Sequence, residues 1–273
     1  MTEPARDDAV LPATRVLSAF IVPFLVVAFV VLYGFPGHTA RLFAWTIKPA
    51  MTPMMLGAVY IGGAYFFVQA YRAGEWHTIK AGFVAVGTFA TAQGVATVVH
   101  WDRFNHDHVA FWLWAGLYFT TPFLVWAAWL ANGRRGSRPG PDDLVLPPPA
   151  RWAIAGVGAV AVVAGLFLFL APARAIDVWP WLLTPLTSRV MGGIFLLGTA
   201  GLGVLTDPRW TTSRLMLRVE VFMLSLVLLA AARAHADFDG ANPLTWSLLG
   251  GFAAVVVGAA ALSRAMDRRT AEQ

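Results

Sequence analysis

The chain has 273 residues, of which 58% are hydrophobic and only 13% are charged, and its formal net charge is +5. Because soluble domains usually carry about 25% charged residues, a soluble fold of this length would leave too much apolar surface in water. The sequence contains no cysteine, which excludes disulfides, thiolate metal sites and cysteine nucleophiles.

Eight apolar stretches reach or approach the roughly 20 helical residues that a bilayer core requires. They lie near 16–34, 53–71, 81–100, 109–131, 152–172, 187–205, 215–234 and 244–263. The sixth is the weakest candidate, because it is short and rich in glycine. The first is too long and too acidic at its start for a cleaved signal peptide, so we expect it to persist as a helix. The sequence therefore predicts an all-α integral membrane protein with about eight transmembrane helices.

The distribution of Lys and Arg predicts the direction of these helices. If the N-terminus is cytoplasmic, the inner segments hold 14 of these residues and the outer segments hold 6. Positive residues concentrate on the cytoplasmic side of membranes. We therefore expect both termini in the cytoplasm of a multi-pass plasma membrane protein, with the lipid bilayer and not nucleic acid as its surroundings. The preference for Arg over Lys is typical of a GC-rich bacterial genome.

A linker rich in Pro, Gly and charge, GRRGSRPGPDDLVLPPPA at 133–150, divides the chain into residues 1–132 and 151–273. The two parts carry similar landmarks in the same order. The matched pairs include Trp45 with Trp181, Gly62 with Gly198, His100 with His235 and Trp112 with Trp246. Coincidence among membrane segments is the alternative. The pattern predicts two four-helix repeats, which are parallel because each has an even number of spans.

Polar residues gather where the third helix of each predicted repeat ends on the outer side, in HWDRFNHDH (100–108) and HADFD (235–239). The candidate ligand or metal residues there are His100, Asp102, His106, His108, His235 and Asp237. Imidazole and carboxylate groups suit a divalent transition metal. One H-x-D motif from each repeat would supply two His and two Asp to a shared site. Haem is disfavoured, because the histidines stand at helix ends and H-x-D is not a haem motif.

The simpler interpretation of these clusters is helix capping and contact with the membrane interface. Asn242 precedes Pro243 in the order that is typical of an N-cap and the first helical position. Asn105 or Asp107 is a candidate cap for the fourth span. Both interpretations remain open at the level of sequence.

Glu220 is the only acidic residue clearly inside a predicted span. Carboxylates within a membrane are costly and are often functional. One interpretation is a structural ion pair with a nearby arginine such as Arg214 or Arg218. The other is a role in proton relay or in substrate binding.

The chain has no P-loop, G-x-G-x-x-G, G-x-S-x-G or H-E-x-x-H motif, so the sequence leans away from an enzyme without excluding one. The leading prediction is transport or binding of a small molecule or ion at an outward-facing cavity between the repeats. The H-x-D residues would line its mouth and Glu220 would act on the cytoplasmic side. The alternatives are a membrane metallo-enzyme or redox protein with an outer His/Asp site, and a non-catalytic accessory subunit that packs on a membrane protein partner or on its own copy.

Overall fold

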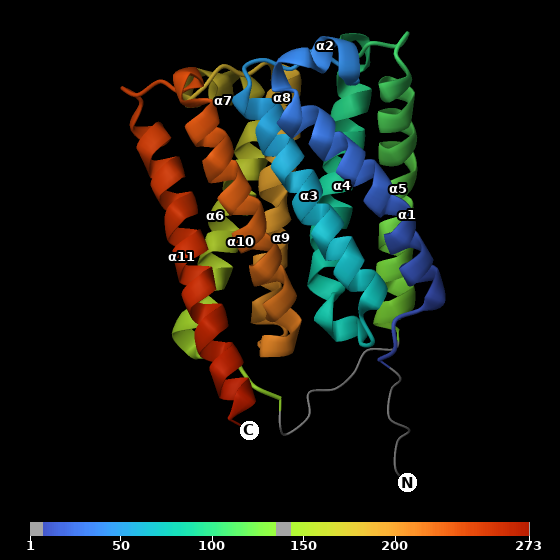
Figure 1. Ribbon diagram of the computed structural model, residues 1–273, viewed down its shortest axis with the longest axis vertical. Helices are drawn as coiled ribbons and strands as arrows, with labels where there is room; N and C mark the ends of the chain where they lie inside the picture. Colours follow the sequence, from blue (N-terminus) through green and yellow to red (C-terminus); the bar gives the residue numbers. More distant parts are fainter. Residues whose placement is uncertain (1–7, 135–142, 273) are drawn as a thin grey trace.

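A computed structural model describes residues 8–134 and 143–272, and these residues form a helical bundle (Figure 1). Within them, eight helical segments are long and apolar enough to cross a membrane. Their bounds are Pro12–Gly34, Met51–Arg72, Lys80–Val99, Val109–Gly133, Pro148–Leu170, Pro185–Leu205, Trp210–Arg233 and Pro243–Ala271. The predicted number of spans is confirmed, and the apolar helices indicate a polytopic membrane protein. Most of the charged part of the predicted linker, 135–142, lies outside the described residues.

Most spans are single α-helices. These are α3 (Met51–Arg72), α4 (Lys80–Val99), α5 (Val109–Gly133), α6 (Pro148–Leu170), α10 (Trp210–Arg233) and α11 (Pro243–Ala271). The first span is α1 (Pro12–Phe29), which contains Pro23 and ends in a π-helical turn over Val30–Gly34. Proline removes a backbone donor from a helix, and π-helical turns are rare irregularities of α-helices.

The sixth span is interrupted. It consists of α8 (Pro185–Phe195) and α9 (Thr199–Leu202), each followed by a 3-10 turn. Three of its glycines, Gly192, Gly198 and Gly201, lie directly against α6: a Cβ at Gly198 would come within 2.8 Å of the carbonyl oxygen of Gly158. Small residues permit this close approach between membrane helices. The high glycine content makes this span difficult to predict from the sequence, but it allows the span to pack closely on α6.

Contact between the first four spans and the last four runs through central helices. Helix α3 packs on α10 and α4 packs on α8, while α1 and α5 lie at one side of the bundle and α11 at the other (Figure 1). In the apolar 18-residue stretch of α3, 78% of the residues are buried, against 11% in that of α11. Large apolar side chains such as Phe123, Val160 and Val257 are exposed. So extensive an apolar surface would be unusual for a soluble monomer, and lipid covers it naturally.

The bundle has two distinct ends. The start of α1 and the end of α11 lie at one end, which we call the terminal end, as an even number of spans requires (Figure 1). The short helices α2 (Thr39–Leu42) and α7 (Pro172–Val178) lie at the other, the distal end. Buried aromatic rings gather beneath these short helices. They include Phe43, Trp45, Phe104 and Trp114 in the first part of the chain, and Trp179 and Trp181 in the second, where the partly buried Phe238 packs on Trp181.

The same kinds of contact occur in both parts of the chain. At the terminal end, isolated β-bridges join Ala9 to Glu75 and Val145 to Arg209. At the distal end, backbone hydrogen bonds of 2.8 Å run from Asn105 to Ala44 and from Asp239 to Pro180. The ring centroids of Trp45 and Phe104 are 5.1 Å apart, as are those of Trp181 and Phe238. Corresponding residues in these pairs are separated by 134 or 136 positions in the sequence.

Candidate functional site

An apolar cavity of about 1030 Å³ lies within the bundle, and all eight spans contribute to its wall. This volume is at the upper end of the range for small-molecule sites, about 300–1,000 Å³. Few hydroxyl or carboxyl groups reach the wall. They belong to Tyr60, Tyr118, Thr121, Thr212, Ser213 and Glu220. The cavity is therefore suited to a molecule whose surface is largely apolar.

Among the residues that the structure describes, Glu220 is the only one with an acidic side chain on this wall. It lies ten residues after Trp210, about 15 Å along α10 from the start of the helix. Met216 and Met223 flank it on the same wall. Within residues 8–134 and 143–272, no hydrogen bond or ion pair of Glu220 is found. A carboxyl group thus faces an apolar space near the middle of its helix without a protein partner among the described residues.

The ion pair expected for Glu220 is not formed. Arg214 and Arg218 instead pair with Asp267 of α11, with nitrogen–oxygen distances of 3.0 and 2.8 Å. On a helix, positions 214 and 218 lie on one face, and that face is turned toward α11. The sequence indicated that Arg214 and Arg218 are neighbours of Glu220, but in the structure both arginines pair with Asp267 of α11.

A second polar group on the cavity wall comes from the first four spans. The hydroxyl groups of Tyr60 on α3 and Tyr118 on α5 are 2.8 Å apart and buried, so each can satisfy the other. Residues on this part of the wall are otherwise aromatic or aliphatic, for example Phe89 and Val59. The two tyrosines therefore give this part of the cavity wall a polar group that carries no charge.

None of the six His and Asp residues predicted as a ligand site lines this cavity. His100 accepts a hydrogen bond of 2.7 Å at Nε2 from Arg189 Nη1. Burial lowers the pKa of His100, and the positive charges of Arg189 and Arg103 lower it further. His100 is therefore a neutral acceptor that joins the first four spans to α8.

Asp237 and His235 form hydrogen bonds with different groups. Asp237 Oδ2 accepts a hydrogen bond of 2.8 Å from the backbone N–H of Met51, at the start of α3. His235 Nδ1 lies 3.3 Å from the carbonyl oxygen of Ala232, at the end of its own helix. Asp102 is exposed in a 3-10 turn. The capping interpretation accounts for Asp237, although the helix it caps belongs to the other part of the chain.

His106 and His108 also make structural contacts at the distal end. His108 Nδ1 accepts from the N–H of Ala110 and caps α5, while Nε2 lies 2.9 Å from the carbonyl oxygen of Arg41. Asn105 and Asp107 were the expected caps, and His108 takes that role instead. His106 packs edge-on against Phe111, with centroids 4.6 Å apart. The second predicted cap, Asn242, is confirmed by its bond of 2.9 Å from Leu244 N–H.

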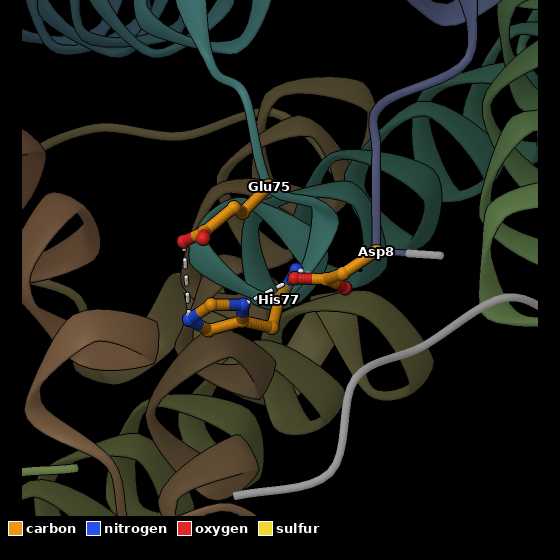
Figure 2. Close-up of side chains that lie close together, drawn as sticks. All are labelled: Asp8, Glu75 and His77. Atoms are coloured by element: carbon orange, nitrogen blue, oxygen red, sulfur yellow. Dashed lines mark hydrogen bonds and ion pairs between the residues drawn. The ribbon is translucent and has the colours of Figure 1, made fainter. Parts of the chain in front are cut away.

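Among the described residues, the one group of three possible metal ligands lies at the terminal end, not at the distal end. It consists of Asp8, Glu75 and His77, whose ligand atoms lie within 4.8 Å of one another. Figure 2 shows the His77 ring between the two carboxylates. Sequence reasoning missed this group, because Asp8 precedes the first span and the other two residues follow the second. The only available signal was that His77 is the sole histidine on the predicted inner side.

A charged network lies beside this group. Asp207 binds Lys80 at 2.6 Å and Arg209 at 2.8 Å, and Arg209 also lies 3.5 Å from Asp143. Burial alone would raise the pKa of Asp207, but hydrogen bonds from Arg209 and Lys80 outweigh it and lower that pKa well below its usual range. Lys80 belongs to α4 and Asp207 follows the sixth span, so the network links the two parts of the chain.

No protein-family model matches this chain, and no curated protein or solved structure matches it.

Proposed function

We propose that this protein binds, and moves within the membrane, a small apolar molecule that carries a positive charge. The binding site is the cavity among the eight spans, and Glu220 is the counter-ion of the ligand. The main support for this proposal is that Glu220 lies on the apolar wall without a hydrogen bond or ion pair among the described residues.

The charge of the ligand follows from the cost of burying a carboxylate. An ionised carboxylate among apolar groups is strongly unfavourable unless it is paired or takes up a proton. A cation in the cavity would pair with Glu220, while the apolar remainder of the ligand would contact side chains such as Met223 and Val227. An inorganic ion fits less well, because few oxygen ligands reach the wall to replace its hydration shell.

Access from the bilayer is favoured over an opening at the distal end. Three side chains that line the cavity are also exposed on the surface of the bundle: Val27 at 63%, Leu113 at 50% and Val157 at 41%. Their helices, α1, α5 and α6, face lipid in a membrane-embedded bundle. The distal end, by contrast, is covered by buried tryptophans such as Trp45 and Trp181. An apolar cation that partitions into the membrane would reach the cavity sideways.

We further propose that the chain comprises two parallel four-helix repeats with both termini in the cytoplasm of a bacterial plasma membrane. The recurrence of bridges, hydrogen bonds and ring pairs at separations of 134 or 136 residues supports the repeat. The excess of Lys and Arg in segments at the terminal end supports the orientation. In this arrangement the cavity lies between the repeats.

An accessory subunit of a membrane complex is the second candidate. The exposure of α11 favours it, because only 11% of that span is buried and a partner helix or a second copy has room to pack there. On this account the cavity would hold lipid chains and would show no preference for a cation.

Direct binding of tetraphenylphosphonium, an apolar cation, tests the proposal. We expect saturable binding to the full chain in detergent, and at least about tenfold weaker binding to Glu220→Gln, equivalent to about 1.4 kcal/mol. Ser225→Ala, an exposed position on the same helix, is the matched control and should bind like the unmodified chain. Equal affinity for Glu220→Gln would overturn the role of Glu220, and absence of saturable binding would favour the accessory subunit.

A further inference from the structure

The terminal end contains an oriented histidine that the proposed function does not use. His77 is 7% exposed, and its ring nitrogen Nδ1 lies 2.5 Å from Asp8 Oδ2. Asp8 also accepts from the backbone N–H of His77 at 3.3 Å through its other oxygen. The Asp8 carboxylate therefore holds both the ring and the backbone of His77 in place.

This arrangement determines which nitrogen of His77 can bind a ligand. A carboxylate accepts hydrogen bonds, so Nδ1 carries the proton that it donates to Asp8. In neutral His77 the lone pair then lies on Nε2. Metal-binding histidines characteristically donate their other N–H to a carboxylate, which fixes the tautomer and makes the ligating nitrogen more basic.

Two oxygen groups face Nε2. Glu75 Oε2 is 3.9 Å away, and the Thr211 hydroxyl of α10 is 3.1 Å away. Two ligands of a tetrahedral ion with bonds of about 2.0–2.2 Å lie about 3.4 Å apart. The Glu75 side chain is 65% exposed, so it is free to move the short distance required. Nitrogen and carboxylate ligands in this arrangement suit Zn²⁺ or Ni²⁺.

We propose that His77 Nε2 and the Glu75 carboxylate, assisted by the Thr211 hydroxyl, bind a divalent transition metal at the terminal end, with Asp8 as the positioning residue. Water completes the coordination, because Glu75 opens to solvent. The site joins the loop after α3 to α10, so a bound metal would restrain these elements relative to each other. This site does not depend on the cation cavity or on Glu220.

Calorimetric titration with Zn²⁺ and with Ni²⁺ tests the site in the full chain, purified without a histidine tag. We expect one equivalent to bind, with the affinity reduced at least about tenfold in His77→Gln and in Glu75→Gln. Asp8→Asn should weaken binding about tenfold while leaving its stoichiometry unchanged. His100→Gln and His235→Gln at the distal end are the matched controls and should bind metal like the unmodified chain.

Several outcomes would overturn this proposal. These are no saturable binding below about millimolar metal, unchanged binding in Glu75→Gln, and loss of binding in the distal variants instead. Because Glu75 is exposed, its variant should fold even if His77→Gln does not, and a melting profile in detergent establishes this. Glu220→Gln should retain the metal, so failure of the metal site and failure of the cation site are distinguishable.

Discussion

Asp237 accepts a hydrogen bond from the backbone N–H of Met51 at 2.8 Å, across 186 positions of sequence. Met51 is the first residue of α3, where backbone N–H groups lack partners within the helix. The carboxylate satisfies one of them and also faces the positive end of the helix dipole. Asp237, which belongs to a sequence motif predicted to bind metal, therefore links the last four spans to α3, the most buried of the first four spans.

Removal of this cap should destabilise the protein. We expect Asp237→Ala to lower the free energy of unfolding by about 1 kcal/mol, the usual cost of losing a helix cap. Asp237→Asn retains an oxygen acceptor and should lose less. Reversible unfolding in mixed micelles measures both. If the alanine variant were as stable as the unmodified chain, the bond to Met51 would contribute nothing.

The sequence was sufficient for features that depend on composition and local spacing. Span number follows from length and hydropathy, and the cap at Asn242 follows from the proline after it. The roles of Asp237 and His108 depended on which distant backbone groups lie near them, and a single sequence does not contain that information. Glu220 was recognisable as a buried acid. Its lack of a partner was not, because Asp267 competes for Arg214 and Arg218 from another helix.

The Asp207 network should contribute to stability in a pH-dependent way. Its folded-state pKa is depressed, so its contribution is present above the unfolded value, about 4, and is lost as the pH falls below that value. Asp207→Asn leaves the buried Arg209 and the partly exposed Lys80 without this carboxylate, and we expect a loss of about 3 kcal/mol at pH 7. Unfolding measured between pH 7 and pH 3 should show a smaller acid-induced decrease for the variant. Parallel curves would exclude this role for Asp207.

His100 should make the protein sensitive to mild acid. Its folded-state pKa is lowered, so the unfolded chain takes up a proton first and stability falls as the pH drops below about 6.5. His100→Gln removes the titrating group and leaves an oxygen that can accept from Arg189. The variant should therefore lose less stability between pH 7.5 and pH 5.5. The prediction fails if both proteins respond equally to pH over that interval.

Filling the cavity should prevent cation binding without disturbing the fold. Gly258 lies on the cavity wall, and a Cβ there would meet no atom within 4 Å. Gly258→Leu should reduce tetraphenylphosphonium affinity at least about tenfold, while melting in detergent changes little. Gly250 on the same helix also has open space but lies off the wall, so Gly250→Leu is the control. Equal binding by the two variants would place the site elsewhere.

In the proposed function, a ligand cation replaces a proton on Glu220, because an ionised carboxylate without a partner is too costly in the apolar cavity. Titration calorimetry with tetraphenylphosphonium, in buffers that differ in ionisation enthalpy, counts the protons released on binding. We predict net release from the unmodified chain and none from Glu220→Gln. Binding without proton release in the unmodified chain, or equal release in the variant, would contradict the claim.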